Sequence, residues 1–270
     1  MIRLENVSFG YGQTQTLHDI NLTVEKGSFT AVVGENGAGK STLLRLIRGL
    51  LKPDSGSVFI DGRDINGKKV KISALAKDIG FLFQNPDRQL CKGTVRDELM
   101  FTLTNVIKDK EECQRLCGEA LSDFGFNGDD VPFEMSRGEK QKVALASTIV
   151  SKPKILILDE PTTGLNFIEC TDMMNRIKAL NEKGCTVVMV CHDMEVVLDY
   201  ADKAVIMDKG RVTAEGKVRD IFYDEDVLKK SAVLPPQIIG LSQMLGNPYG
   251  RVYTPEEMAE AVGKKRSVEK

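Results

Sequence analysis

The chain has 270 residues, of which 41% are hydrophobic and 28% charged, as in a soluble globular protein. Its 37 Lys and Arg against 39 Asp and Glu leave a net charge of −2, so no basic excess favours nucleic acid. The opening MIRLENVSFG alternates like a strand rather than a signal peptide, and no apolar run approaches the ~20 residues that span a bilayer. Six cysteines without a CxxC pair favour reduced thiols in a cytosol over a zinc site. If the protein works at a membrane, another chain must hold it there.

The first part of the chain is rich in short apolar segments of alternating pattern. These predict strands at 2–11, 16–24, 28–34, 55–62 and 79–84, with a helix at 40–51 directly after a glycine-rich turn. From Asn85 to about Val150 the pattern becomes helical and contains no predicted strand. We expect this stretch to form a helical subdomain inserted into the fold.

Strands and helices alternate again after Val150. The pattern predicts strands at 154–160 and 186–191, helices at 166–184 and 194–201, and a hairpin at 203–216. This order predicts an α/β fold whose mostly parallel sheet is covered on both faces. We expect one domain over residues 1–222 and a C-terminal helical extension over 223–270. In the extension, Thr254 and Glu257 predict a capping box that starts a helix, and Gly263 predicts its end.

The stretch GENGAGKST, between a predicted strand and a predicted helix, matches the phosphate-loop pattern G-x-x-x-x-G-K-[ST]. Its glycines let backbone N–H groups point at phosphate oxygens, Lys40 reaches the terminal phosphates, and Ser41 supplies a hydroxyl to Mg²⁺. A plain glycine-rich turn that caps a helix is the weaker alternative. The predicted ATP-binding residues are Gly34, Asn36, Gly37, Ala38, Gly39, Lys40, Ser41 and Thr42.

Two acids, Asp159 and Glu160, stand at the carboxyl end of a predicted central strand, where open α/β sheets bind ligands. We predict that Asp159 holds Mg²⁺ and that Glu160 acts as the general base on the attacking water. Two acids after a strand can also be the solvated start of a loop, and the phosphate loop is what favours the catalytic interpretation.

The stretch MSRGE, residues 135–139, has two possible meanings. Ser136 followed by Glu139, ahead of an apolar periodic run, is a capping box at a helix start. A serine and a glycine at exposed helix-start amides also suit an anion. At this point both interpretations remain open.

Four further pieces complete a family resemblance. They are Gln84, MSRGEKQ before the acidic strand, PTTGLN after it, and His192 at the end of the next strand. Together with the phosphate loop and ILILDEP, they resemble the ATP-binding cassette (ABC) ATPases in order, from about residue 2 to 220. The resemblance implies a P-loop NTPase of the ABC type with an N-terminal antiparallel β subdomain and an inserted α-helical subdomain.

The resemblance also implies roles within the chain's own site. Tyr11 would stack on adenine, and Gln84 would touch the metal and the attacking water. His192 would contact the γ-phosphate and position the water of Glu160. The alternatives are a simple strand aromatic for Tyr11 and a structural histidine for His192.

Other residues would act on the ATP of a second subunit in a head-to-tail dimer. The resemblance places Ser136 and Gly138 against that ATP's γ-phosphate, and Asn166 in a loop that crosses the interface. This chain departs from the usual L-S-G-G-Q signature at Met135, which keeps an apolar contact, and at Arg137 and Glu139. We expect the positive charge of Arg137 to offset the negative charge of Glu139. Asn166 also replaces a usual aspartate, and Phe167 a usual proline.

A narrower resemblance follows Gln84. The stretches QNPDRQL, FGF…VPFEMS and VLPPQIIGLSQML are similar to ATPases of energy-coupling-factor transporters, which import vitamins and cobalt or nickel ions. These pair two ATPases with a transmembrane coupling protein and a substrate-binding membrane protein. The implied docking surface is the cleft between core and helical lobe, near Asn85 to Leu90. There Asp87 is either a partner for a basic residue of the membrane subunit or a solvated turn acid.

The sequence thus predicts an ATP-hydrolysing subunit on the cytoplasmic face of a membrane, held peripherally by an importer. The second ATPase can be an identical chain or a relative. The alternatives are a subunit of another ABC transporter, a soluble ABC ATPase of DNA repair or translation, and a regulatory half whose site turns over slowly.

Overall fold

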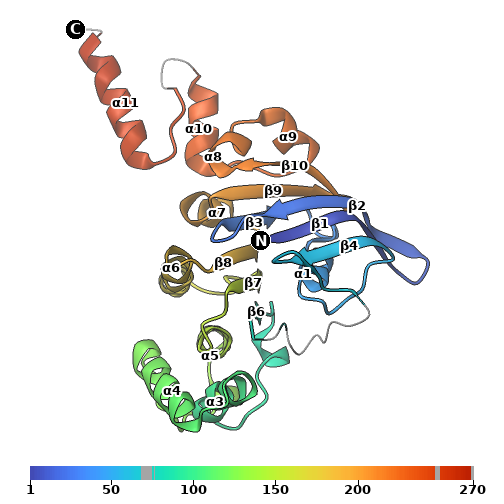
Figure 1. The fold of residues 1–270 in the computed structure, drawn as a ribbon. Coiled ribbons are helices and arrows are strands. Elements are labelled where there is room, and N and C mark those ends of the chain that lie inside the picture. Colours follow the sequence, from blue (N-terminus) through green and yellow to red (C-terminus); the bar gives the residue numbers. More distant parts are fainter. Residues whose placement is uncertain (68–74, 76, 247–249, 269–270) are drawn as a thin grey trace.

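The computed structural model describes residues 1–67, 75, 77–246 and 250–268, which form two sheets and the helices around them (Figure 1). The larger sheet has six strands in the order β10-β9-β3-β8-β7-β6. Their bounds are β3 Phe29–Val33, β6 Ile79–Leu82, β7 Ile155–Asp159, β8 Thr186–Val190, β9 Lys203–Asp208 and β10 Arg211–Lys217. All neighbours pair in parallel except β9 and β10, which form the predicted antiparallel hairpin. The mostly parallel sheet is confirmed.

The parallel strands are buried on both faces, so their residues alternate between two hydrophobic clusters. Val32, Ile157 and Val188 face one cluster, which also contains the second sheet and helix α1 (Lys40–Ile47). Their chain neighbours Ala31, Leu156 and Val187 face the other cluster, with the helices of the opposite side. A period of two explains why β3, β7 and β8 read as continuous apolar runs.

The second sheet has four strands in the order β2-β1-β4-β5, and all its pairs are antiparallel. Its bounds are β1 Ile2–Tyr11, β2 Thr14–Val24, β4 Ser55–Ile60 and β5 Arg63–Asp64. One face of β1 is buried and the other partly exposed, as the alternating sequence predicts. This is the predicted N-terminal antiparallel β subdomain.

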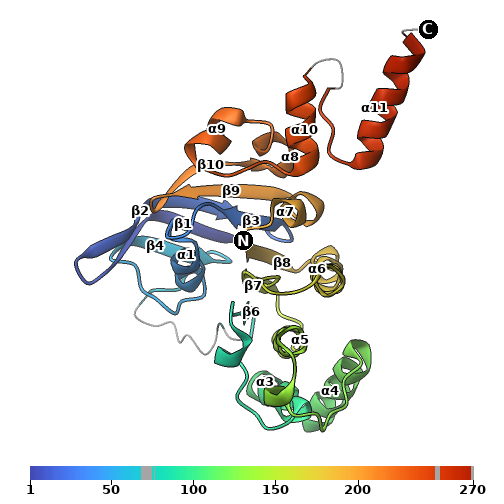
Figure 2. The same cartoon turned by 180° about the vertical axis from the view of Figure 1, so that it is seen from behind.

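Helices fill the stretch between β6 and β7, and both views place them beyond the β6 edge of the large sheet (Figures 1 and 2). They are η1 Pro86–Arg88, α3 Val95–Val106, α4 Lys110–Phe124, η2 Pro132–Glu134 and α5 Arg137–Ile149. The sequence marks their ends: the Asp109 side chain caps α4, and Gly125 ends it with φ 70°.

The remaining helices follow β7, and the last of them lie at the end of the molecule opposite α3 and α4 (Figure 1). They are α6 Phe167–Glu182, α7 Met194–Tyr200, α8 Val218–Ile221, α9 Glu225–Lys230, α10 Gln237–Leu245 and α11 Pro255–Val268. Leu228 and Ile239 pack into the same cluster as the large sheet. Within the described residues, no helix has the length and apolar character needed to cross a membrane.

One predicted boundary is wrong, because α11 does not end at Gly263 but continues to Val268. Gly263 is not among the glycines with positive φ, so it stays in the helix, at a cost of about 1 kcal/mol relative to alanine. The predicted helix start is correct, although Glu257 accepts its reciprocal hydrogen bond from the Tyr253 amide rather than from Thr254.

Candidate functional site

The glycines of the phosphate loop are required by its shape. The loop joins β3 to α1, and Gly34, Gly37 and Gly39 have φ of 148°, 85° and 95°. A Cβ on Gly34 would lie 2.1 Å from the carbonyl oxygen of Met207 in β9, so no other residue fits there. The loop therefore curls tightly against the end of the large sheet.

Lys40 lies inside this loop. Its Nζ donates to the carbonyl oxygens of Gly34 and Glu35, at 2.8 Å each. Burial lowers the pKa of Lys40, while the nearby carboxylates of Glu160 and Asp159 oppose that effect. The ammonium is thus held at the mouth of the loop, beside both predicted acidic residues.

Asp159 ends strand β7 and is only 6% exposed. Its Oδ1 accepts a hydrogen bond of 2.9 Å from the Ser41 hydroxyl in the first turn of α1. Burial raises the pKa of Asp159, and the Glu160 charge adds to this, against the hydrogen bond from Ser41. The two residues predicted to hold Mg²⁺ are therefore in contact.

These oxygens fit a magnesium ion. Mg²⁺ is usually held by one or two carboxylates together with water and substrate phosphates. The described residues contain no group of three or more His, Cys, Asp and Glu arranged for a metal. The third predicted ligand, Gln84, directs its amide nitrogen to Glu160, and its contact with a metal stays a prediction.

Glu160 is the centre of a hydrogen-bonded constellation. Its Oε2 accepts from Gln84 Nε2 at 2.6 Å and from Thr163 Oγ1 at 3.1 Å, and its Oε1 lies 2.9 Å from His192 Nε2. The residue has φ 51°, the left-handed region that non-glycine residues rarely adopt. The constellation brings together three predicted residues from the ends of β6, β7 and β8. Thr163 was missed, although its place in PTTGLN, three residues after Glu160, was a signal.

Tyr11 lies at the end of β1 and is 47% exposed. Its ring packs edge-on against Phe9, with ring centroids 4.9 Å apart, and its hydroxyl accepts a hydrogen bond from Arg45 at 3.4 Å. Its stacking on adenine stays a prediction.

The MSRGE stretch begins helix α5 as predicted, with Ser136 as N-cap and Arg137 as the first helical residue. Ser136 and Glu139 form the reciprocal hydrogen bonds of a capping box. Asn166 forms a second capping box, with Glu169, at the start of α6. The two helix starts lie close together, because a Cβ on Gly138 would be 2.4 Å from the Glu169 carboxylate.

The expected charge compensation between Arg137 and Glu139 is not present. The Arg137 side chain packs instead over Gly164, where a Cβ would lie 2.8 Å from Arg137 Nε. Gly164 has φ 82° and belongs to the loop between Thr163 and Asn166. The guanidinium thus lies on the loop of its own chain.

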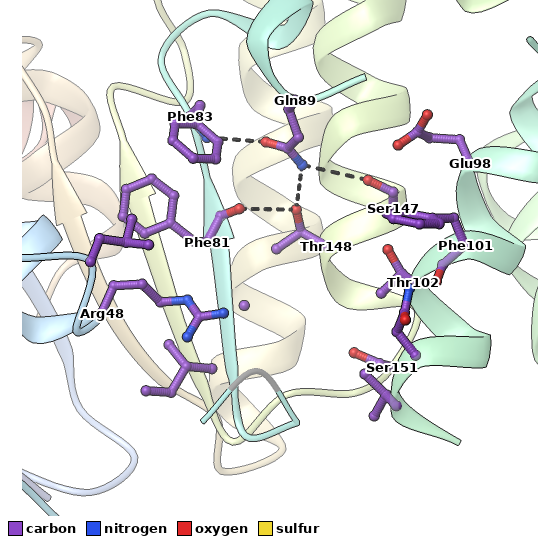
Figure 3. Close-up of a pocket in the computed structure, with 15 residues that line it drawn as sticks. Arg48, Phe81, Phe83, Gln89, Glu98, Phe101, Thr102, Ser147, Thr148 and Ser151 are labelled. Atoms are coloured by element: carbon purple, nitrogen blue, oxygen red, sulfur yellow. Dashed lines mark hydrogen bonds between the residues drawn. The ribbon is translucent and has the colours of Figure 1, made fainter. Parts of the chain in front are cut away.

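A groove lined by Phe83, the residue before Gln84, opens between β6 and the helices α3 and α5 (Figure 3). Its volume is about 400 Å³, and the aromatic rings of Phe81, Phe83 and Phe101 line it. Gln89 braces it by accepting from the Phe83 amide at 3.1 Å and donating to Thr148 at 2.8 Å. Asp87, at the adjoining turn, forms an ion pair of 3.0 Å with Lys140 of α5.

Comparison with known families agrees with this geometry. The family model described as ABC transporter matches residues 17–163. An ABC transporter ATP-binding protein of Caldanaerobacter subterraneus is 40% identical over 253 residues, covering 92% of this chain and 44% of that protein. The chain thus spans under half the length of this relative.

Other relatives match along nearly their whole length. The energy-coupling factor transporter ATP-binding protein EcfA2 of the same organism is 37% identical, over 90% of this chain and 88% of that protein. That of Clostridium perfringens is 35% identical, over 91% and 90%.

Solved structures agree as well. CbiO1 of Clostridium perfringens, part of an ABC transporter complex, superposes with a TM-score of 0.75 at 33% identity, over 89% of this chain and 97% of that one. A dimeric ATP-binding cassette bound to ADP and phosphate superposes with a TM-score of 0.74 at 30% identity, over 81% and 99%. Fold, site and relatives together identify this chain as a member of the ABC transporter ATPase family, an ATP-binding and ATP-hydrolysing cassette.

Proposed function

We propose that this chain energises an importer of the energy-coupling-factor type, which takes up a vitamin or a cobalt or nickel ion. The observation that carries the proposal is the similarity to two EcfA2 proteins along about nine-tenths of each chain. The similarity to CbiO1, named as part of a transporter complex, supports it.

In this proposal Glu160 takes the proton of the water that attacks the γ-phosphorus, and the bond between the β- and γ-phosphates breaks. Gln84, Thr163 and His192 hold the carboxylate in place through the hydrogen bonds described above. Lys40 stabilises negative charge on the terminal phosphates. Mg²⁺, held by Ser41 and Asp159, would neutralise phosphate charge when bound.

A second ATPase, identical or related, would complete the site. Two subunits would bind two ATP molecules between them, each phosphate loop facing the helix start of the other's Ser136. Gly138 and Asn166 would lie in the same interface. Closure on ATP and opening after hydrolysis would move the region around Gln84, which adjoins the groove.

The groove beside Gln84 has the chemistry of a docking site for a membrane coupling protein. Phe101 is 45% exposed on its wall, and at its edge Leu50 is 49% exposed. The Nη1 atom of Arg48 is buried there, and no group in the described part of the chain accepts a hydrogen bond from it. A docked segment with apolar side chains and one acceptor would cover these groups. Such docking would hold the chain peripherally on the cytoplasmic face of the membrane.

The test is extraction of the tagged chain from membranes in mild detergent, followed by identification of the membrane proteins that remain bound. We expect a coupling protein and a substrate-binding protein. Phe101→Ser should reduce their recovery about tenfold, because interface anchors of this kind carry about 1–2 kcal/mol or more. Leu234→Ser, 82% exposed in the segment between α9 and α10, is the matched control. Recovery of ribosomes or DNA without membrane proteins would contradict the proposal.

A further inference from the structure

The hydrogen-bond donors of Ser136 are already occupied within this chain. The Oε2 atom of Glu139 accepts from the Ser136 hydroxyl at 2.7 Å and from the Ser136 amide at 2.9 Å. Ser136 Oγ in turn lies 3.3 Å from the Glu139 amide. One carboxylate oxygen therefore takes both the hydroxyl and the amide proton of the residue predicted to contact phosphate.

The Glu139 carboxylate stays charged and lacks a close counter-ion. Hydrogen bonds from Ser136 hold the pKa of Glu139 below its ordinary value, and Lys142 adds only a weaker through-space attraction. No ion pair to Glu139 occurs within the described ranges of the chain. Lys140, the next residue in the chain, pairs with Asp87, and Arg137, two residues before Glu139, packs over Gly164.

At the two other capping boxes in the described part of the chain, the capping glutamate accepts no hydrogen bond from a side-chain hydroxyl. At α6, Glu169 accepts from the Asn166 amide at 2.9 Å, and at α11, Glu257 accepts from the Tyr253 amide at 2.6 Å. Only a backbone amide is engaged in each case. The hydrogen bond from the Ser136 hydroxyl to Glu139 is therefore an addition to the capping contacts found at these two other helix starts.

We propose that Glu139 competes with the γ-phosphate of the partner's ATP for Ser136, so that this chain contributes a weakened half to the site it completes. The inference rests on the proposed sandwich of two ATPases. A phosphate oxygen must displace a charged acceptor at 2.7 Å, and it meets the repulsion of that carboxylate while it does so. If the second ATPase is a different chain, the two sites of the pair bind ATP unequally.

The test is Glu139→Gln, which preserves size and the capping box but removes the charge. Sedimentation velocity with Mg²⁺ and a non-hydrolysable ATP analogue measures the nucleotide concentration at which half of the chain is dimeric. The chain is studied with the second ATPase that co-purifies with it, or alone if none does. We expect Glu139→Gln to lower this half-point about fivefold, the effect of roughly 1 kcal/mol.

Glu257→Gln is the matched control, since it neutralises the capping glutamate of α11 and should leave the half-point unchanged. The melting temperatures of the two variants should agree, which separates competition from helix capping. The inference is overturned if Glu139→Gln leaves the half-point unchanged or raises it, or if Glu257→Gln lowers it equally. It is also overturned if neither the parent nor any variant forms a dimer with nucleotide. The assay needs no membrane protein, so its failure and that of the importer proposal are distinguishable.

Discussion

Asp159 is a carboxylate that the fold places in an unfavourable environment. It is 6% exposed, it adjoins Glu160, and its close hydrogen-bond partner is the neutral hydroxyl of Ser41. A buried acid of this kind is common at functional sites, because the ligand rather than the protein balances its charge. The residue was predicted from its place after an apolar strand, but the contact with Ser41 depends on how α1 meets β7 and was visible only in the structure.

The raised pKa of Asp159 makes the nucleotide-free chain sensitive to pH in a defined direction. A raised folded-state pKa means that the stability contributed by this group is present at acid pH and is lost as pH rises through that pKa. Asp159→Asn should therefore raise the melting temperature at pH 7.5, by about 2–4 °C for roughly 1 kcal/mol. Differential scanning calorimetry between pH 4 and 8 should show the gain shrinking toward acid pH. The exposed Asp129→Asn is the control, and a gain that is equal at all pH values would refute the explanation.

At the scale of elements, the start of α5 and the loop before α6 form one unit. The buried Gln141 of α5 donates to the carbonyl oxygen of Pro161 at 3.2 Å, and Arg137 packs over Gly164. Between these two contacts lies Thr163, which donates to Glu160. The start of α5, which we propose faces the second ATPase, is thus connected to the constellation around Glu160 of the same chain.

We expect Arg137→Gly to lower kcat about two- to fivefold without changing the ATP concentration at half-saturation, because it loosens the loop that holds Thr163. Gly164→Ala should have a similar effect in the parent, since its Cβ would displace Arg137. In the Arg137→Gly background, where the contact is already absent, Gly164→Ala should lower turnover no further than the backbone strain of an alanine at positive φ does. Gly125→Ala, at φ 70° with open space around it, measures that strain alone. Additive effects of the two substitutions on steady-state turnover would contradict a contact between them.

For the whole molecule, sequence pattern and resemblance predicted the sheet, the glycine-rich loop after its strand, and the gathering of Gln84, Glu160 and His192 at one edge, but not Thr163. They succeeded there because strand ends in a parallel sheet meet at one edge, so local order determines which side chains assemble. They failed where an outcome depends on competition between contacts. Arg137 was expected near Glu139, yet it packs on Gly164, and Gly263 was expected to end a helix that continues through it. The division at residue 222 stays a prediction, and Leu228 and Ile239 beyond it pack into the main core.

The most direct test of the account is the steady-state ATPase activity of the intact complex carrying Glu160→Gln. A general base contributes about 10²–10⁴-fold, so we expect turnover at this chain's site to fall at least about 100-fold while ATP binding is retained. Glu215→Gln, at an exposed position of β10, should leave turnover unchanged. If Glu160→Gln turns over ATP as fast as the parent, Glu160 is not the base and the proposed mechanism is wrong.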